Sequence, residues 1–194
     1  MGTAAERKGM SATPDYDDRF RHLYLNHGED LRAYCRRRLG REDADDALAE
    51  VFAVAWRRLD KIPEGQDARL WLYGVARNVV RNATRTTRRT ARLSSRLTAS
   101  SEAPRSGPAE SLVTRTEHED VKAALSTLKP SDQELLRLHA WEELSRNEIA
   151  QVLGISVAAV DMRLHRAIAR MSVVLRSRGF TGHTRRAENG GGKP

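Results

Sequence analysis

The stretch LSRNEIAQVLGISVAAVDMRLHRAIAR, residues Leu144–Arg170, has the pattern of two short helices joined by a tight turn. Ser145 and Glu148 have the S-x-x-E spacing of a capping box, which predicts that a helix begins directly after the serine. Gly154 tolerates a positive φ and predicts the turn, and Ser156 is placed to cap the next helix. This pattern is typical of a helix-turn-helix, although an ordinary helical hairpin carries the same capping signals.

The second helix of this stretch has an apolar stripe and an outward face. Residues at three- and four-residue spacing predict the buried stripe, which consists of Val160, Leu164, Ala167, Ile168 and Met171. The outward residues are mostly small or basic: Ala158, Ala159, Met162, Arg163, His165 and Arg166. A helix with such a face fits the major groove of DNA, so we expect it to read a DNA sequence.

The composition favours a nucleic-acid partner and two small domains. The chain has 194 residues, a formal net charge of +8 and only 39% hydrophobic residues. No segment approaches the ~20 apolar residues that span a bilayer, and no signal-peptide core follows Met1, so we expect a cytoplasmic protein without membrane insertion. Cys35 is the single cysteine, which excludes an internal disulfide, and no His and Cys residues have the spacing of a zinc site.

A first helical segment is predicted from Asp15 up to Gly40, which closes it. Asn26, His27 and Gly28 are weak helix formers and mark a candidate break in its middle.

A second helix is predicted from about Asp43 to Leu59. Its core face consists of Ala44, Leu48, Val51, Phe52, Ala55 and Leu59. The opposite face holds Asp43, Asp46, Glu50 and Arg57 around Ala53 and Val54. An acidic rim around a small apolar patch suits a protein partner better than DNA, the alternative being a solvated face.

A third helix is predicted over residues 68–89, after a loop with Pro63 and Gly65. One face carries a basic stripe of Arg77, Arg81, Arg85 and Arg88, with Asn78 and Asn82 beside it. Residues 77–96 contain seven arginines and no acid, which repel one another unless an anionic partner is present. Trp71 and Tyr73 are placed either to stack on unpaired bases or to pack against the first helix.

The remaining segments complete an all-α chain of two small domains. Loss of periodicity and two prolines predict a linker from Thr90 to Ser111; beyond it, Val121, Leu125 and Leu128 indicate a helix that ends before Pro130. A second capping box, Ser131 to Glu134, predicts the start of the next helix. The expected organisation is a disordered arm (1–14), a first domain (15–89), a flexible linker (90–115), a helix-turn-helix domain (116–178) and a disordered tail (179–194).

Three motifs in this order resemble the extracytoplasmic-function group of bacterial sigma factors. DADDALAEVFAVAWRR (43–58) resembles the helix that docks on core RNA polymerase, and RLWLYGVARNVVRN (69–82) resembles the helix that binds the promoter −10 element. LSRNEIAQVLGISVAAVDMRLHRA (144–167) resembles the reader of the −35 element. The resemblance covers about residues 20–89 and 121–176 and implies two domains, sigma region 2 and sigma region 4.

The resemblance also implies site residues. Those implied to bind core RNA polymerase are Asp46, Glu50, Ala53, Val54 and Arg57. Those implied to bind the −10 element are Trp71, Arg77, Asn78, Arg81, Asn82 and Arg85, with the loop 59–69 holding a flipped base. Those implied to bind the −35 element are Ala158, Ala159, Asp161, Met162, Arg163, His165 and Arg166.

The chain departs from the family pattern at a few of these positions. Ala49 stands where the family usually has Gln, and Ala158 and Ala159 stand where it has a Gly-Thr pair. Asp161 stands where Lys or Arg is common. An acid there repels the DNA backbone unless it accepts a hydrogen bond from a cytosine amino group or pairs with an arginine.

The expected function is an alternative sigma factor that directs recognition and melting of promoter DNA. Opening ten base-pair steps costs about 14 kcal/mol, whereas each stacked base returns about 1–3 kcal/mol, so melting requires core RNA polymerase. The sequence has no P-loop, and we expect no enzymatic activity, cofactor, metal or catalytic residue. The resemblance implies an anti-sigma factor as a further partner. The alternative is a conventional helix-turn-helix regulator that does not bind core polymerase; a nucleic-acid enzyme is disfavoured by the lack of a catalytic motif.

Overall fold

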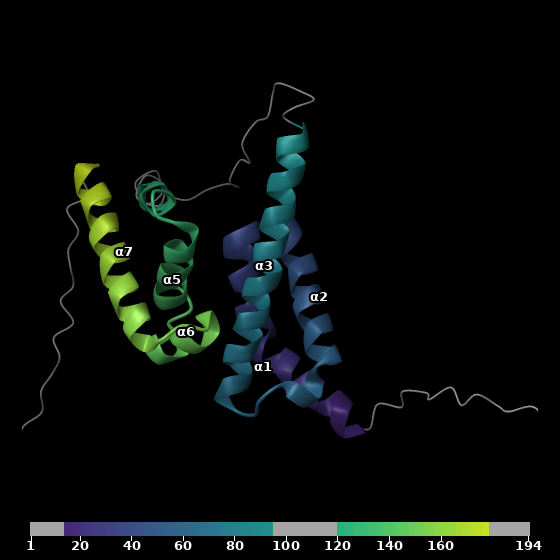
Figure 1. The fold of residues 1–194 in the computed structure, drawn as a ribbon. Coiled ribbons are helices and arrows are strands. Elements are labelled where there is room, and N and C mark those ends of the chain that lie inside the picture. Colours follow the sequence, from purple (N-terminus) through teal and green to yellow (C-terminus); the bar gives the residue numbers. More distant parts are fainter. Residues whose placement is uncertain (1–13, 95–119, 179–194) are drawn as a thin grey trace, which may run out of the picture. The chain divides into compact units, whose positions relative to one another are not determined.

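The computed structural model describes residues 14–94 and 120–178, and within these residues the fold is all-α, as predicted (Figure 1). The helices are α1 (Pro14–Leu39), α2 (Glu42–Arg57), the 3₁₀ helix η1 (Leu59–Lys61), α3 (Gln66–Ser94), α5 (Pro130–Ala140), α6 (Arg146–Leu153) and α7 (Val157–Ser177). Residues 120–126 are also helical. The chain divides into two compact units, one built on α1, α2 and α3 and the other on α5, α7 and the first part of α6.

In the first unit, α1, α2 and α3 each pack against the other two (Figure 1). The whole core face predicted for the second helix is buried: Ala44, Leu48, Val51, Phe52, Ala55 and Leu59. Aromatic rings join α1 to α2, since Phe20 meets Trp56 edge-on with ring centroids 5.0 Å apart and Phe52 in the same way at 5.9 Å. Amphipathic periodicity therefore identified the core of this unit correctly.

The candidate break in the first helix is absent, because α1 runs without interruption from Pro14 to Leu39. Gly28 is buried, and a Cβ atom there would lie 3.8 Å from the ring of Tyr24, so the glycine sits beside this side chain within the helix. Packing against α2 and α3 overrides the weak local propensity at this point. Gly40, with a φ of +89°, ends the helix as predicted.

The third helix is longer than the sequence predicted. It begins at Gln66 and continues to Ser94, so residues 90–94, expected in the linker, are helical. The hydroxyls of Thr86, Thr87 and Thr90 donate to the carbonyls four residues earlier at 3.1, 3.1 and 3.2 Å. These bonds satisfy the threonine side chains within the helix instead of ending it. The rest of the predicted linker, the amino-terminal arm up to residue 13 and the tail after residue 178 lie outside the described residues.

The helix-turn-helix of the second unit forms with the predicted caps. The amide of Ser145 donates to Glu148 Oε2 at 2.8 Å, and the amide of Glu148 donates to Ser145 Oγ at 3.3 Å, which is a reciprocal capping box. Gly154 has a φ of +65°, and Ser156 Oγ accepts from the amide of Ala159 at 3.2 Å. Hydrogen bonds between near neighbours in sequence therefore fix this corner.

The second predicted capping box was wrong. Helix α5 begins at Pro130, with Lys129 as its N-cap and no side-chain cap bond. Proline has its φ already set for the first helical position and lacks the amide that would need a partner there, so the helix starts one residue before Ser131.

The buried apolar stripe on α7, the second helix of the helix-turn-helix, is narrower than predicted. Val160, Leu164 and Ala167 are buried, but Ile168 is 49% exposed and Met171 is partly exposed. Ile168 lies roughly 80° around the helix from Val160, at 3.6 residues per turn, which places it at the edge of the face that packs against α5.

Candidate nucleic-acid interface

The solvent-facing side of α2 carries the residues predicted to contact a protein. Asp46, Glu50, Ala53 and Arg57 are exposed, and Val54 is partly buried. Within the residues that the structure describes, neither the Asp46 nor the Glu50 side chain takes part in an ion pair or a hydrogen bond. The structure therefore presents two unneutralised carboxylates beside a small apolar patch on a rigid helix, whose other side is anchored in the core. We call Asp46, Glu50, Ala53, Val54 and Arg57 the α2 surface.

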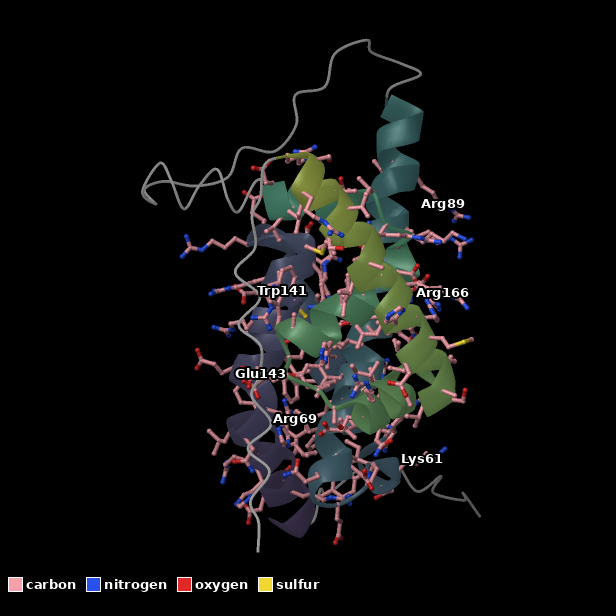
Figure 2. All side chains as sticks on the ribbon, turned by 90° about the vertical axis from the view of Figure 1, so that its left-hand side faces the viewer. Lys61, Arg69, Arg89, Trp141, Glu143 and Arg166 are labelled. Atoms are coloured by element: carbon pink, nitrogen blue, oxygen red, sulfur yellow. The ribbon has the colours of Figure 1, made fainter. Side chains whose placement is uncertain are left out.

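The basic stripe of α3 is largely in solvent. Arg81 and Arg85 are exposed, as are Asn78 and Asn82, and Arg77 is partly buried. The only acid in the helix is Asp67, in its first turn, so nothing along the stripe offsets the arginine charge within α3. Arg89 also projects from this helix (Figure 2). The result is a positive field along one helix, which attracts an anionic polymer.

The two aromatic residues at the start of α3 have different surroundings. Tyr73 is only 2% exposed, and its ring centroid lies 5.5 Å from that of Tyr34 in α1, so it packs in the core instead of stacking on bases. Trp71 is partly exposed. Of the two, Trp71 is the one accessible to an unpaired base.

The loop between α2 and α3 is anchored by buried side chains on one side and exposed to solvent on the other. Leu59 and Ile62 are buried at 0% and 3% exposure, while Lys61 lies on the surface (Figure 2). The guanidinium of Arg19 in α1 donates to the carbonyl of Ile62, which anchors the loop from a helix 43 residues away in sequence. Sequence analysis missed Arg19, because no local pattern indicates a hydrogen bond to a distant carbonyl.

Most of the outward residues predicted on α7 are accessible. Ala158, Met162, His165 and Arg166 are exposed, and Ala159 is partly exposed. Met162 is 58% exposed, and Arg166 Nη2 donates to its sulfur at 3.8 Å, which aligns the two side chains along the helix surface. Arg166 is labelled in Figure 2. Small residues near the helix start with longer polar ones further on leave room for the helix to approach base edges.

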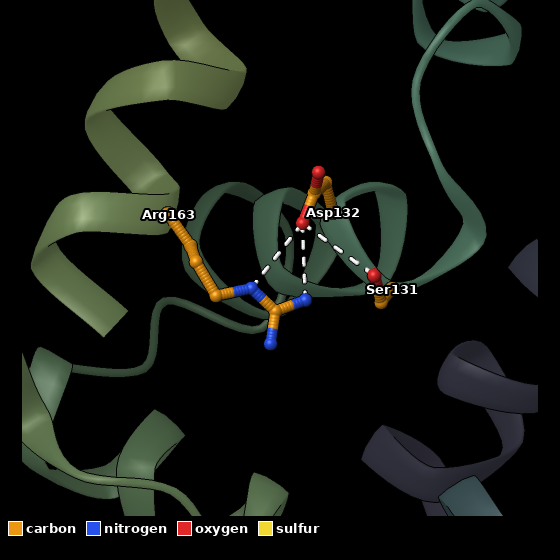
Figure 3. Close-up of polar contacts among 3 residues, drawn as sticks. All are labelled: Ser131, Asp132 and Arg163. Atoms are coloured by element: carbon orange, nitrogen blue, oxygen red, sulfur yellow. Dashed lines mark hydrogen bonds and ion pairs between the residues drawn. The ribbon is translucent and has the colours of Figure 1, made fainter. Parts of the chain in front are cut away.

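Arg163 does not point outward as predicted. Its Nε and Nη2 atoms donate to Asp132 Oδ1 of α5 at 3.3 and 3.0 Å, and Ser131 Oγ lies 3.5 Å from the same oxygen (Figure 3). The side chains of Asp132 and Arg163 are 15% and 32% exposed. A guanidinium that meets a largely buried carboxylate across two packed helices is fixed there, so the Arg163 side chain is directed at α5 and positions α7 on it.

Asp161 forms an ion pair with Arg146, the first residue of α6. Both side chains are well exposed, at 50% and 59%. Pairing with an arginine was one of the two ways in which an acid was expected to be tolerated on a helix predicted to face DNA, and Arg146 is such an arginine.

In residues 14–94 and 120–178 no group of three or more His, Cys, Asp or Glu side chains is arranged to hold a metal ion. None of the helices over these residues is long and apolar enough to cross a membrane.

Comparison with known proteins gives two family matches that cover both units. Residues 23–90 match the family described as Sigma-70 region 2, and residues 118–171 match Sigma-70, region 4. The RNA polymerase sigma factor CnrH of Cupriavidus metallidurans is 31% identical over 80% of this chain and 86% of its own length. The ECF RNA polymerase sigma factor SigL of Mycobacterium tuberculosis is 28% identical over 83% of this chain and 91% of its own length.

Solved structures agree with these matches. CnrH, solved in complex with the cytosolic domain of CnrY, has a TM-score of 0.59 at 28% identity and covers 81% of this chain and 88% of that chain. The sigma factor RpoE from Bartonella quintana, solved with the anti-sigma factor NepR, has a TM-score of 0.62 at 23% identity, covers 81% of this chain and 96% of that chain, and shares the fold.

Proposed function

The chain belongs to the sigma-70 family as a sigma factor of the extracytoplasmic-function group, and from that premise we propose which of its surfaces performs each step of initiation. It is an alternative sigma factor that binds RNA polymerase and directs transcription initiation, and not a conventional helix-turn-helix regulator. The observation that carries the assignment is the match of both units, in order, to sigma region 2 and sigma region 4.

The first proposal is that the α2 surface docks on core RNA polymerase. Its support is the pair of exposed carboxylates on a helix whose opposite side is buried, because a protein partner can neutralise them and cover the apolar residues between them. Asp46→Arg with Glu50→Arg should abolish co-purification with core polymerase while leaving the circular dichroism spectrum unchanged. Glu29→Arg, an exposed acid on α1, is the matched control and should bind normally. Equal loss by the control would contradict the assignment.

The second proposal is that α3 and the preceding loop engage the −10 element. The basic stripe supplies backbone contacts through Arg77, Arg81 and Arg85, while Asn78, Asn82 and Trp71 are accessible to bases. Replacing Arg81 and Arg85 together by alanine should reduce open-complex formation by the reconstituted holoenzyme and reduce its salt dependence, with about 0.9 lost from the log–log slope per phosphate contact. Arg36→Ala on α1, also exposed, should have little effect.

The third proposal is that α7 reads the −35 element. Its accessible face consists of Ala158, Ala159, Asp161, Met162, His165 and Arg166, whereas Arg163 acts by positioning the helix. Arg166→Ala should lower transcription from a promoter with a −35 element more than from one that lacks it. Equal losses on both promoters would remove Arg166 from the reading face.

Two further proposals concern the setting. Sigma factors are in general DNA-recognition proteins, so we assign this chain no catalytic activity and place it in the cytoplasm with RNA polymerase. The relative CnrH was solved with the cytosolic domain of CnrY, and the sigma factor RpoE from Bartonella quintana was solved with the anti-sigma factor NepR. We propose that an anti-sigma factor binds this chain as well. Such a partner should compete with core polymerase; simultaneous binding of both would contradict the proposal.

The decisive experiment for the whole assignment is transcription from a promoter library by core RNA polymerase with and without this chain. New start sites that share −35 and −10 motifs are expected. Tight binding to duplex DNA without any change in start sites would refute the assignment.

A further inference from the structure

The ion pair between Arg146 and Asp161 lies on the surface of the helix-turn-helix and not in its core. Arg146 begins α6, and Asp161 lies in the second turn of α7, so the pair joins the amino-terminal parts of the two helices. Both side chains keep half or more of their surface in solvent. An exposed ion pair contributes little to stability, so stability alone does not account for an acid at this position.

The position of Asp161 on α7 is that of a residue near base edges. It precedes His165 by four residues, so the two side chains lie on the same side of the helix, away from the buried residues Val160 and Leu164. In a helix-turn-helix, the amino-terminal residues of the second helix contact base edges, while the first helix crosses the DNA backbone. Asp161 is thus on the base side of the motif, and Arg146 is on the backbone side.

The chemistry of a carboxylate restricts what it can recognise there. A carboxylate only accepts hydrogen bonds, and in the major groove the amino group at N4 of cytosine is the donor that Asp and Glu select. Unpaired, the same carboxylate would be repelled by the phosphates on either side of the groove. The guanidinium of Arg146 removes that cost, because it neutralises the carboxylate and holds it in one orientation.

We propose that Asp161 is a specificity residue that selects a cytosine in the −35 element, with Arg146 as the residue that positions it and neutralises its charge. The proposal rests on the assignment of α7 to the −35 groove, and it names a base preference that this assignment alone does not give.

The test is selection of −35 sequences from a randomised library by the reconstituted holoenzyme, with a fixed −10 element. The wild-type chain should enrich a C·G pair at one position by about 5- to 10-fold, the lower range for a single base contact. Asp161→Ala should lose enrichment at that position and keep it elsewhere. Asp161→Asn should move the preference toward adenine, because an amide both donates to and accepts from that base. Arg146→Ala should weaken the cytosine preference without replacing it by another base.

A matched control is Asp120→Ala. It also removes one negative charge and one ion pair to an arginine, but that arginine, Arg178, lies after the end of α7. It should leave every base preference unchanged. If Asp161→Ala binds all −35 sequences more tightly with an unaltered preference, the acid only repels DNA and the proposal is overturned. If the wild type enriches no −35 sequence at all, the assignment of α7 itself fails, which is a separate and recognisable result.

Discussion

Arg163 either positions α7 through its ion pair with Asp132 or contacts DNA directly. A double-mutant cycle on the ion pair tests the first role. Two donor atoms of Arg163 share one oxygen of Asp132 at 3.0 and 3.3 Å, and the carboxylate is 15% exposed. Hydrogen bonds to charged groups contribute about 1.5–3 kcal/mol. The two donors share a single acceptor oxygen and the guanidinium is 32% exposed, so we expect a coupling of about 1–2 kcal/mol in the free energy of unfolding.

The cycle consists of the wild type, Asp132→Ala, Arg163→Ala and the double variant, each measured in the full chain. Asp132 lies in the first turn of α5, where a negative charge also interacts favourably with the helix dipole. Asp132→Ala should therefore lower the free energy of unfolding by about 0.5 kcal/mol more than loss of the ion pair alone. That additional loss cancels in the cycle. Urea unfolding gives the free energies, and amide hydrogen exchange assigns the loss to α5 and α7. The more exposed pair of Arg178 and Asp120 is the control and should show a coupling below about 1 kcal/mol.

The same variants decide how Arg163 affects DNA. If it positions α7, then Asp132→Ala and Arg163→Ala should weaken −35 binding by similar factors and leave its salt dependence unchanged. The reasoning is refuted if Arg163→Ala alone weakens binding and lowers the log–log salt slope by about 0.9, because that is the signature of a phosphate contact. A coupling energy indistinguishable from zero would also refute it.

Three further predictions follow from single residues. Gly154→Ala should destabilise the helix-turn-helix by about 1–2 kcal/mol in thermal unfolding, because φ at this residue is +65°. No atom lies within 4 Å of the added Cβ, so the expected loss comes from backbone strain and not from a steric clash. Ser145→Ala should cost about 1 kcal/mol, and Glu148→Ala should add a further loss, because each side chain of the capping box accepts from a different backbone amide. Burial holds the pKa of His27 below its usual value of 6.5, so the unfolded chain binds more protons. The stability of the first unit should therefore fall as pH drops below about 6.5, and His27→Gln should flatten that dependence; a rise in stability on acidification would contradict it.

Sequence was sufficient wherever the structure depends on near neighbours. The capping box of Ser145 and Glu148, the turn at Gly154 and the cap at Ser156 each involve residues at most three apart, so their hydrogen bonds were readable from spacing. The periodicity of α2 likewise separated its buried face from the α2 surface, because a helix repeats every 3.6 residues. Burial of one face then leaves the other face to solvent.

Tertiary packing determined the features that sequence analysis missed or assigned wrongly. Arg163 was predicted to point outward, but its guanidinium is held by Asp132, 31 residues earlier, which is brought beside it when α7 packs on α5. Arg19 reaches the carbonyl of Ile62 across 43 residues. Local propensity predicted a break in α1 near Gly28, yet packing in the three-helix unit preserves the helix.

Whether a feature could be predicted from the sequence or required the tertiary structure depends on how far apart in the sequence the interacting residues lie. Caps, turns and amphipathic faces are set by backbone geometry within a few residues, so the sequence by itself determined an all-α chain with a helix-turn-helix and a second helix whose exposed face is acidic. The partner of a long charged side chain depends on which helices meet and at what register. Only the tertiary structure therefore decided that Arg163 is held by Asp132 and that the charge of Asp161 is paired to Arg146.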